Sequence, residues 1–238
     1  SATSVGSIDS VYQANTTAGF SIVTYTATGS AGTLAHGLGV KPEWIVIKNR
    51  GKDEGWAVYH GANTSAPETD GLSLNSTNAT SDSADYWNDV APTTTTFSVA
   101  ADDRSGGSYN FVAYVFNSVQ GYSKFGSYVG NGNADGPFVY TGFKPSFLII
   151  KNTSDGNDQW IMWDNKRSTF NPVDDYLEPS TNAAESANSN WAIIDFVSNG
   201  FKVRNGDISY NQSSYNYIYI AFAEHPFVSS EGVPCTAR

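Results

Sequence analysis

Paired acidic side chains are the residues of this sequence whose spacing could support catalysis, because glycan hydrolysis needs two carboxylates facing one bond. The acids are Asp53, Glu54, Asp102, Asp103, Asp155, Asp158, Asp164, Asp174, Asp175, Glu178 and Asp195. Most lie in Gly- or Asn-rich segments typical of turns, where acids serve turn geometry and solvation. Asp164 and Asp195 stand beside apolar residues that could raise a carboxyl pKa, but neither has an obvious second acid. We therefore predict no catalytic residues and a protein that is not an enzyme.

Metal and cofactor chemistry has little support in the sequence. His36, His60 and His225 are far apart, and no His-x-His or Cys-x-x-Cys spacing brings metal ligands together. The turn 152–158 carries oxygen ligands but lacks the spacing and closing Glu of an EF-hand loop. We predict no metal ligands and no cofactor, with a structural calcium ion in this turn as the alternative.

Aromatic side chains can either stack on sugars from an exposed β face or fill a core. Trp56 and Trp87 recur as Trp160 and Trp191 in the repeat described below, and we interpret these four as core residues. The aromatics without a counterpart are the candidates for a ligand-binding surface. They are Tyr59, Trp163, Tyr176 and Tyr210, with Tyr122 as a further possibility.

Composition and charge restrict the class of protein. The formal net charge is −10 at pH 7, which disfavours binding to nucleic acid or to an anionic membrane. No segment approaches the ~18 apolar residues that span a bilayer, so we predict no membrane insertion. Cys235 is the single cysteine and cannot form an internal disulfide. Because the chain begins at Ser1, we expect a fragment or processed product of a longer protein.

The elements that would position these residues are set by an internal repeat. Residues 39–49 (GVKPEWIVIKN) recur as residues 142–152 (GFKPSFLIIKN). In each copy Lys-Pro keeps the chain extended, and four apolar residues then indicate a strand covered on both faces. We interpret this stretch as the central strand of a module, forming a hairpin with Trp56–His60 in the first copy.

The repeat extends over nearly the whole chain and sets the predicted domains. Residues 1–19 form an N-terminal arm or linker, 20–122 a first β module, 123–228 a second, and 229–238 a tail. Short β-branched and aromatic runs between turn residues predict an all-β fold, with two tandem, pseudo-twofold-related, jelly-roll-like β-sandwich modules. Residues 181–187 are the only stretch with helical composition, which makes a short helix within 180–195 the alternative there.

Several stretches resemble a repeat domain of tail-fibre and other virion structural proteins of tailed, often marine, bacteriophages. They are 20–29, 35–42, 56–60, 121–143 and 217–227. The resemblance implies a virion component, and it brings no catalytic set of residues.

Three functions follow from these expectations. The first is a non-enzymatic tail-fibre or receptor-binding module, a homotrimer that contacts other virion proteins and a host surface glycan or protein. The second is a capsid decoration or head-fibre protein that stabilises the shell, with the N-terminal arm docked into a neighbour. The third is a polysaccharide depolymerase. Such enzymes usually show a long β-helix of many short repeats, which two copies of about a hundred residues do not make.

Overall fold

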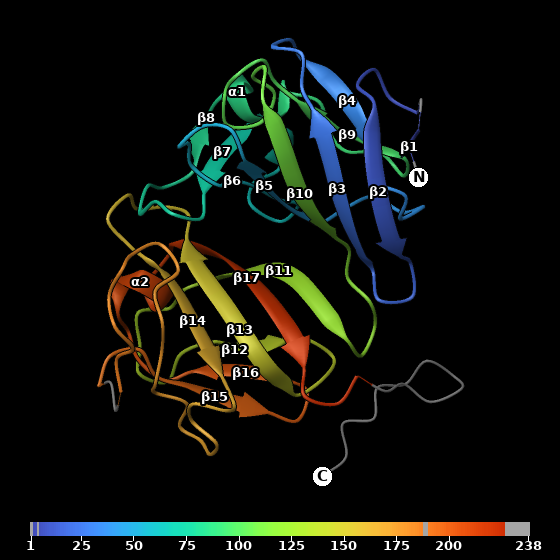
Figure 1. The fold of residues 1–238 in the computed structure, drawn as a ribbon. Coiled ribbons are helices and arrows are strands. Elements are labelled where there is room, and N and C mark those ends of the chain that lie inside the picture. The colour runs from blue at the N-terminus through green and yellow to red at the C-terminus, as the bar shows by residue number, and fades with distance from the viewer. Residues whose placement is uncertain (1, 4, 188–189, 227–238) are drawn as a thin grey trace. The chain divides into compact units, whose positions relative to one another are not determined.

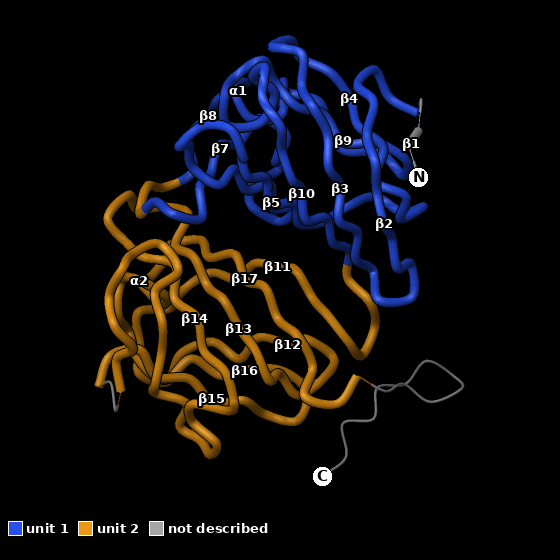
Figure 2. The backbone as a smooth tube through the Cα atoms, viewed as in Figure 1, with its two compact units in different colours: residues 1–76, 80–117 blue, residues 77–79, 118–238 orange. Residues whose placement is uncertain are grey.

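The computed structural model describes residues 2–3, 5–187 and 190–226, and the protein is all-β, as predicted, with antiparallel sheets (Figure 1). The chain forms two compact units (Figure 2). Unit 1 comprises residues 1–76 and 80–117, and unit 2 comprises residues 77–79 and 118–238. Among the described residues, no helix is long and apolar enough to cross a membrane. The predicted tail 229–238, with Cys235, lies outside the described residues.

Unit 1 is built on a sheet in which β1, β2, β3, β10, β5, β6, β7 and β8 are hydrogen-bonded in that order, while β4 pairs separately with β9. Its elements are β1 (Ala2–Thr3), β2 (Ser10–Asn15), β3 (Phe20–Thr26), β4 (Gly32–Ala35), β5 (Trp44–Asn49), β6 (Ala57–His60), the 3-10 helix η1 (Pro67–Thr69), β7 (Asp70–Ser73), β8 (Ser81–Asp82), α1 (Ala84–Trp87), β9 (Thr96–Val99) and β10 (Asn110–Phe116).

The core of unit 1 lies between this sheet and the β4–β9 ladder. Alternation along β3 directs Val23 and Tyr25 inward, where they join Ile45 and Ile47 of β5 and Phe97 of β9 in one buried cluster. The arrangement is sandwich-like. The predicted hairpin is confirmed, because Trp44 pairs with His60 and Ile47 with Ala57.

The expected N-terminal arm is part of unit 1. Ser10–Asn15 pairs along its whole length with β3, from Ser10 opposite Tyr25 to Asn15 opposite Phe20. Tyr12 and Ala14 pack against the core, while Val11 and Gln13 face outward. The prediction of an arm or linker was wrong for these residues, because alternation over only six positions gave a weak strand signal.

Unit 2 has two sheets, with strand orders β11-β17-β13-β14 and β12-β16-β15. Its elements are β11 (Ser123–Val129), β12 (Phe138–Tyr140), β13 (Pro145–Asn152), β14 (Trp160–Asp164), β15 (Ile194–Val197), β16 (Gly200–Val203), α2 (Ile208–Asn211) and β17 (Asn216–Ala223). Side chains of both sheets form one buried cluster that includes Leu148, Ile150, Phe201 and Tyr217.

Two local motifs occur in both units. The side-chain oxygen of Asn49 accepts hydrogen bonds from the N–H groups of Gly51 and Lys52, and that of Asn152 accepts from the corresponding groups of Ser154 and Asp155. Each asparagine thereby fixes the turn that follows its central strand.

The second shared motif is a buried tyrosine hydroxyl that donates to a backbone carbonyl. Tyr25 donates to Ser105 and Tyr128 to Tyr210, and each ring stacks at 5.1 Å on an aromatic residue of the neighbouring strand. The partners in these stacks are Phe111 and Tyr217 respectively.

Other expectations are met only in part. Residues 180–187 and 190–195 contain no helix, and α2 lies instead at Ile208–Asn211. Trp87 and Trp160 are buried, as interpreted, whereas Trp56 and Trp191 are only half-buried.

Candidate functional site

The four aromatics predicted to bind a ligand are all buried. Exposure is 1% for Tyr59, 0% for Trp163, 6% for Tyr176 and 0% for Tyr210. The Trp163 indole donates to the Ala192 carbonyl at 3.0 Å. No ring of this set offers a face to solvent, so their burial contradicts the predicted role. For two of them the premise was wrong, because Tyr59 opposite Ile45 and Trp163 opposite Leu148 are equivalent core positions of the repeat.

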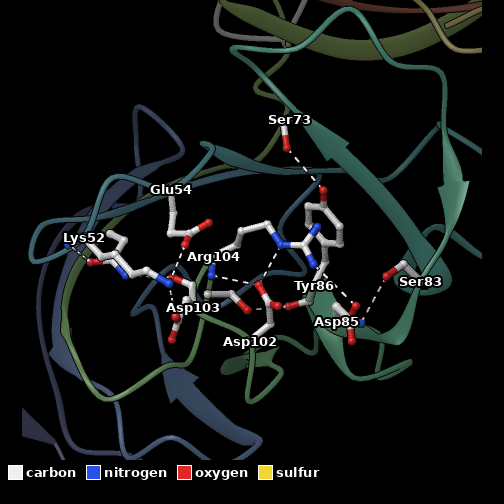
Figure 3. Close-up of polar contacts among 11 residues, drawn as sticks. Lys52, Glu54, Ser73, Ser83, Asp85, Tyr86, Asp102, Asp103 and Arg104 are labelled. Atoms are coloured by element: carbon white, nitrogen blue, oxygen red, sulfur yellow. Dashed lines mark hydrogen bonds and ion pairs between the residues drawn. The ribbon is translucent and has the colours of Figure 1, made fainter.

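The polar turns of unit 1 bring several of the predicted acids together (Figure 3). Lys52, in the β5–β6 turn, forms ion pairs of 2.8 Å with Glu54 and 2.5 Å with Asp103. The side-chain amide of Asn49 donates to the Asp103 carbonyl at 2.7 Å. These contacts join the turn 50–55 to the loop before β10 and hold both in place.

Arg104 forms the second half of this cluster. Its guanidinium pairs with Asp102 at 2.6 Å and with Asp85 at 3.4 Å, and it lies over the Tyr86 ring, 4.3 Å from the centroid (Figure 3). The hydrogen bond from Arg104 holds the pKa of Asp102 below its ordinary value. A general acid requires the opposite shift. The Asp102–Asp103 pair is thus arranged for ion pairing.

The corresponding turn of unit 2 contains a buried polar network. Lys151, 0% exposed, donates from Nζ to the carbonyls of Asn152 at 2.7 Å, Asp158 at 2.9 Å and Thr77 at 3.1 Å. The Asp158 carboxylate accepts from the Asn152 amide at 2.6 Å and from the Ser209 hydroxyl at 3.0 Å. These polar groups are therefore hydrogen-bonded to other groups of the same network.

The same network bears on the calcium alternative. Asn152 and Asp155 direct side-chain oxygens at N–H groups of their own turn, and Asp158 accepts the bonds described above. In the described part of the chain, no group of three or more His, Cys, Asp or Glu residues is arranged to hold a metal ion. The turn geometry is accounted for by hydrogen bonds within the protein.

Asp164 and Asp195, the acids closest to a catalytic environment in the sequence, each face an arginine. Asp164 forms an ion pair with Arg167 and accepts from its N–H at 2.9 Å, while Arg167 also pairs with Glu185 at 2.5 Å. Asp195 pairs with Arg204 at 3.5 Å. Neither carboxylate is placed as one of two free acids across a substrate bond.

Two of the histidines have structural roles. The ring nitrogen Nδ1 of His36 accepts from the Leu38 N–H at 3.2 Å, and that of His60 accepts from Ala62 at 3.2 Å. Both rings are buried, and burial lowers the pKa of His36. His225 is exposed and follows the last strand.

An open groove of about 630 Å³ on unit 1 is the best candidate for a binding site. Its exposed polar lining is Asp9, Thr24, Thr26, Arg50 and Asn110, from the residue before β2, from β3 and β10, and from the turn after β5. Ser10 of β2 also borders the groove but is buried. The Thr26 hydroxyl donates to Asn110 at 2.6 Å, and the Arg50 N–H donates to the Asn110 carbonyl at 2.8 Å. Among the described residues, no acid forms an ion pair with Arg50.

This groove has the chemistry of a binding site for a hydroxyl-rich polymer. A guanidinium, amide and hydroxyl groups offer both donors and acceptors to sugar hydroxyls. Asp9 is its single acid, and hydrolysis by a carboxylate pair needs two. Sequence reasoning missed the groove because it joins residues of β2, which was expected to be an arm, to the β5–β6 turn.

Sequence reasoning also missed the exposed aromatics. They are Phe138 at 48%, Tyr140 at 64% and Phe170 at 83% exposure. Two of them differ between the repeats. Leu34 lies opposite Phe97 and Val139 opposite Phe201, so Thr33 and Ala35 of β4 take the places of Phe138 and Tyr140. An aromatic residue present in one copy and replaced by a small one in the other is not required by the shared fold.

Comparison with known proteins identifies a family without a known activity. A family model described as a domain of unknown function, DUF7483, matches residues 1–226. No curated protein and no solved structure matches the chain.

Proposed function

The chain belongs to the DUF7483 family of domains of unknown function, and we propose that it is a non-enzymatic attachment module that binds a host surface glycan or protein. We further propose that it is a tail-fibre or receptor-binding component of a bacteriophage virion, built from two tandem copies of one β sandwich. The bacteriophage origin rests on the sequence resemblance alone. The proposed assembly is a homotrimer in contact with other virion proteins.

The observation that carries the binding role is the open groove of unit 1. All of its polar groups except Asp9 come from three strands and one turn, and strands fix side chains more precisely than flexible loops do. The Asn49 hydrogen bonds and the Lys52 ion pairs hold the turn that bears Arg50. A prepositioned donor set reduces the entropy lost on binding.

The non-enzymatic part of the proposal is supported by the environment of the acids. Asp102 and Asp103 are held by Arg104 and Lys52, and Asp164 by Arg167. For Asp102 the hydrogen bond from Arg104 lowers the pKa, which favours the charged carboxylate and makes it a poor proton donor.

The proposal of tandem sandwiches is supported by the motifs that both units share, including the asparagine turns and the stacked tyrosines. The capsid-decoration alternative drew on a free N-terminal arm. Ser10–Asn15 is instead paired with β3 in unit 1, which removes that support.

Binding of the purified protein to cells of the host tests the proposal. We expect wild-type protein to bind, purified surface polysaccharide to block binding, and Arg50→Ala to weaken it by about tenfold, the effect of losing one charged hydrogen bond. Arg204→Ala is the matched control, since Arg204 is exposed but lies outside the groove. Equal binding by the wild type and Arg50→Ala would contradict a role of the groove in binding the host surface.

Electron microscopy of labelled virions separates the tail from the capsid. The proposal predicts label on tail fibres, and label distributed over the capsid lattice would contradict it.

A further inference from the structure

A second cavity, of about 300 Å³, lies in unit 2, where the segment that precedes β11 meets the end of β12. Its polar lining comprises Ser118, Gln120, Ser123, Lys124, Tyr140 and Thr141. The groove of unit 1 is formed by other residues, so the two sites can be tested separately.

Tyr140 forms an exposed aromatic wall of this cavity. The ring is 64% exposed, and it lies beside Gly142, where an added Cβ would be 3.6 Å from the tyrosine hydroxyl. Gly142 has a φ of +87°, a backbone conformation that favours glycine. An exposed ring beside a polar cavity can stack on the apolar face of a sugar while polar groups bind its hydroxyls.

Unit 1 contains the same backbone motif, but there the space beside it is filled by side chains. The Leu38 N–H donates to the His36 side chain at 3.2 Å, and the Phe143 N–H donates to the Thr141 side chain at 3.4 Å. By this motif Gly37 takes the structural place of Gly142, although the sequence repeat aligns Gly142 with Gly39, two residues further on.

At Gly37 the space is taken by the chain itself. A Cβ added there would lie 2.2 Å from the Tyr12 ring of β2, and Ala35, at the position of Tyr140, is 3% exposed. The open cavity of unit 2 is thus a departure from the repeat, and the shared fold does not require it.

The charge of this cavity is unusual for an acidic protein. Its lining has one cation, Lys124, and no Asp or Glu, in a chain of net charge −10. Over the residues that the structure describes, Lys124 forms no ion pair, whereas Lys52, Lys144 and Lys202 each have an acidic partner. An unpaired lysine beside an exposed ring selects for a ligand that combines a negative charge with an apolar face.

We propose that this cavity binds one acidic sugar residue of the hexuronate class, with Tyr140 stacked on the sugar ring and Lys124 paired with its carboxylate. The exposed side chain of Gln120 is available for a ring hydroxyl. This inference rests on the proposed host-surface function for the source of the sugar, a surface glycan.

Ligand-observed and protein-observed NMR with two simple sugars tests the proposal on the full chain. The probes are methyl β-D-glucuronide and methyl β-D-glucoside, which differ in a carboxylate and a hydroxymethyl group. We expect the wild type to bind the glucuronide more tightly, and the preference to shrink as NaCl is raised from about 0.05 to 0.5 M, because salt screens an exposed ion pair.

Two variants and two controls locate the site. Tyr140→Ala should weaken glucuronide binding by about tenfold. Lys124→Gln should weaken it by about threefold to tenfold, so that this variant binds the glucuronide about as weakly as the glucoside. Phe170→Ala and Lys166→Gln change an exposed ring and an exposed lysine outside this cavity and should leave binding unchanged. Unchanged amide spectra away from the cavity establish that each variant is folded.

Absence of glucuronide binding by the wild type, or binding unaffected by Tyr140→Ala, would overturn the site. Equal affinity for both sugars in the wild type would overturn the role of Lys124. If cell binding depends on Arg50 and not on Tyr140, the proposed function stands and this inference fails. If neither sugar nor cells are bound, both fail.

Discussion

Replacing Lys151 by methionine should destabilise unit 2 much more than the equivalent change destabilises unit 1. The Lys151 ammonium is fully buried, and its three N–H groups match three carbonyl acceptors, those of Thr77, Asn152 and Asp158. Methionine keeps the apolar stem but leaves these carbonyls without their donor. A buried polar group left without a partner costs about 1–3 kcal/mol, and we expect a total loss of about 3 kcal/mol, since such effects are not additive.

Lys48→Met is the matched control, because Lys48 occupies the same place in the repeat. Its Nζ is only half-buried, donates to the Glu54 carbonyl at 2.6 Å, and lies 5.8 Å from the centre of the Trp56 ring. One hydrogen bond and one exposed cation–π contact are together worth about 1 kcal/mol. Native-state hydrogen exchange in urea, followed by peptide-resolved mass spectrometry, measures the free energy of opening of residues 145–164 and 44–60 separately.

The pH dependence of this difference gives a second readout. Burial lowers the pKa of Lys151 from 10.5 to about 8 in the folded protein. Between these values the unfolded chain binds more protons, so stability rises with pH. The advantage of the wild type over Lys151→Met should therefore widen from pH 8 to 10.5. A loss below 1 kcal/mol, or an advantage that narrows with pH, would refute this reasoning.

The hydroxyls of Tyr25 and Tyr128 each donate to a buried carbonyl, so changing either to Phe should cost about 1 kcal/mol in urea denaturation; no effect would show that neither bond stabilises the fold. Arg104 lowers the pKa of Asp102, so stability from this pair is present above the ordinary carboxyl pKa and is lost as pH falls through the lowered value. NMR titration of Arg104→Met should show the pKa of Asp102 rising, and an unchanged value would contradict the assignment. Wild type and Asp164→Asn should both release no reducing sugar from bacterial polysaccharide; release by the wild type alone would restore the enzyme hypothesis.

Much of the fold could be predicted from local sequence patterns. The run 44–49 became β5 and its repeat became β13 (Pro145–Asn152), each with strand partners on both sides. Unbroken apolar residues after a Lys-Pro step specify such a strand without any knowledge of its neighbours. Residues 10–15 alternate over too few positions to predict a strand from the sequence. Their strand conformation depends on pairing with β3, a contact between segments that no local pattern displays.

The site could be predicted less well, because exposure depends on contacts that the sequence does not display. Tyr59 lies opposite Ile45 and Trp163 opposite Leu148, so the two rings occupy equivalent buried positions that sequence comparison did not match. Tyr140 is exposed in keeping with strand alternation after the buried Val139, but the three-residue strand Phe138–Tyr140 is too short for that alternation to be recognised in the sequence. Position-by-position comparison of the two copies would have distinguished Tyr140 from Ala35, whereas no local pattern indicates that Arg50 and Asn110 border one groove.

A microbial glycan array, followed by mass spectrometry of the bound glycans, tests the central claim most directly. The account predicts that the wild type is retained on a subset of surface glycans, that Arg50→Ala is retained about tenfold less, and that the masses of the bound glycans are unchanged. Retention on no glycan, or the appearance of shortened products, would contradict a non-enzymatic module that binds surface glycans.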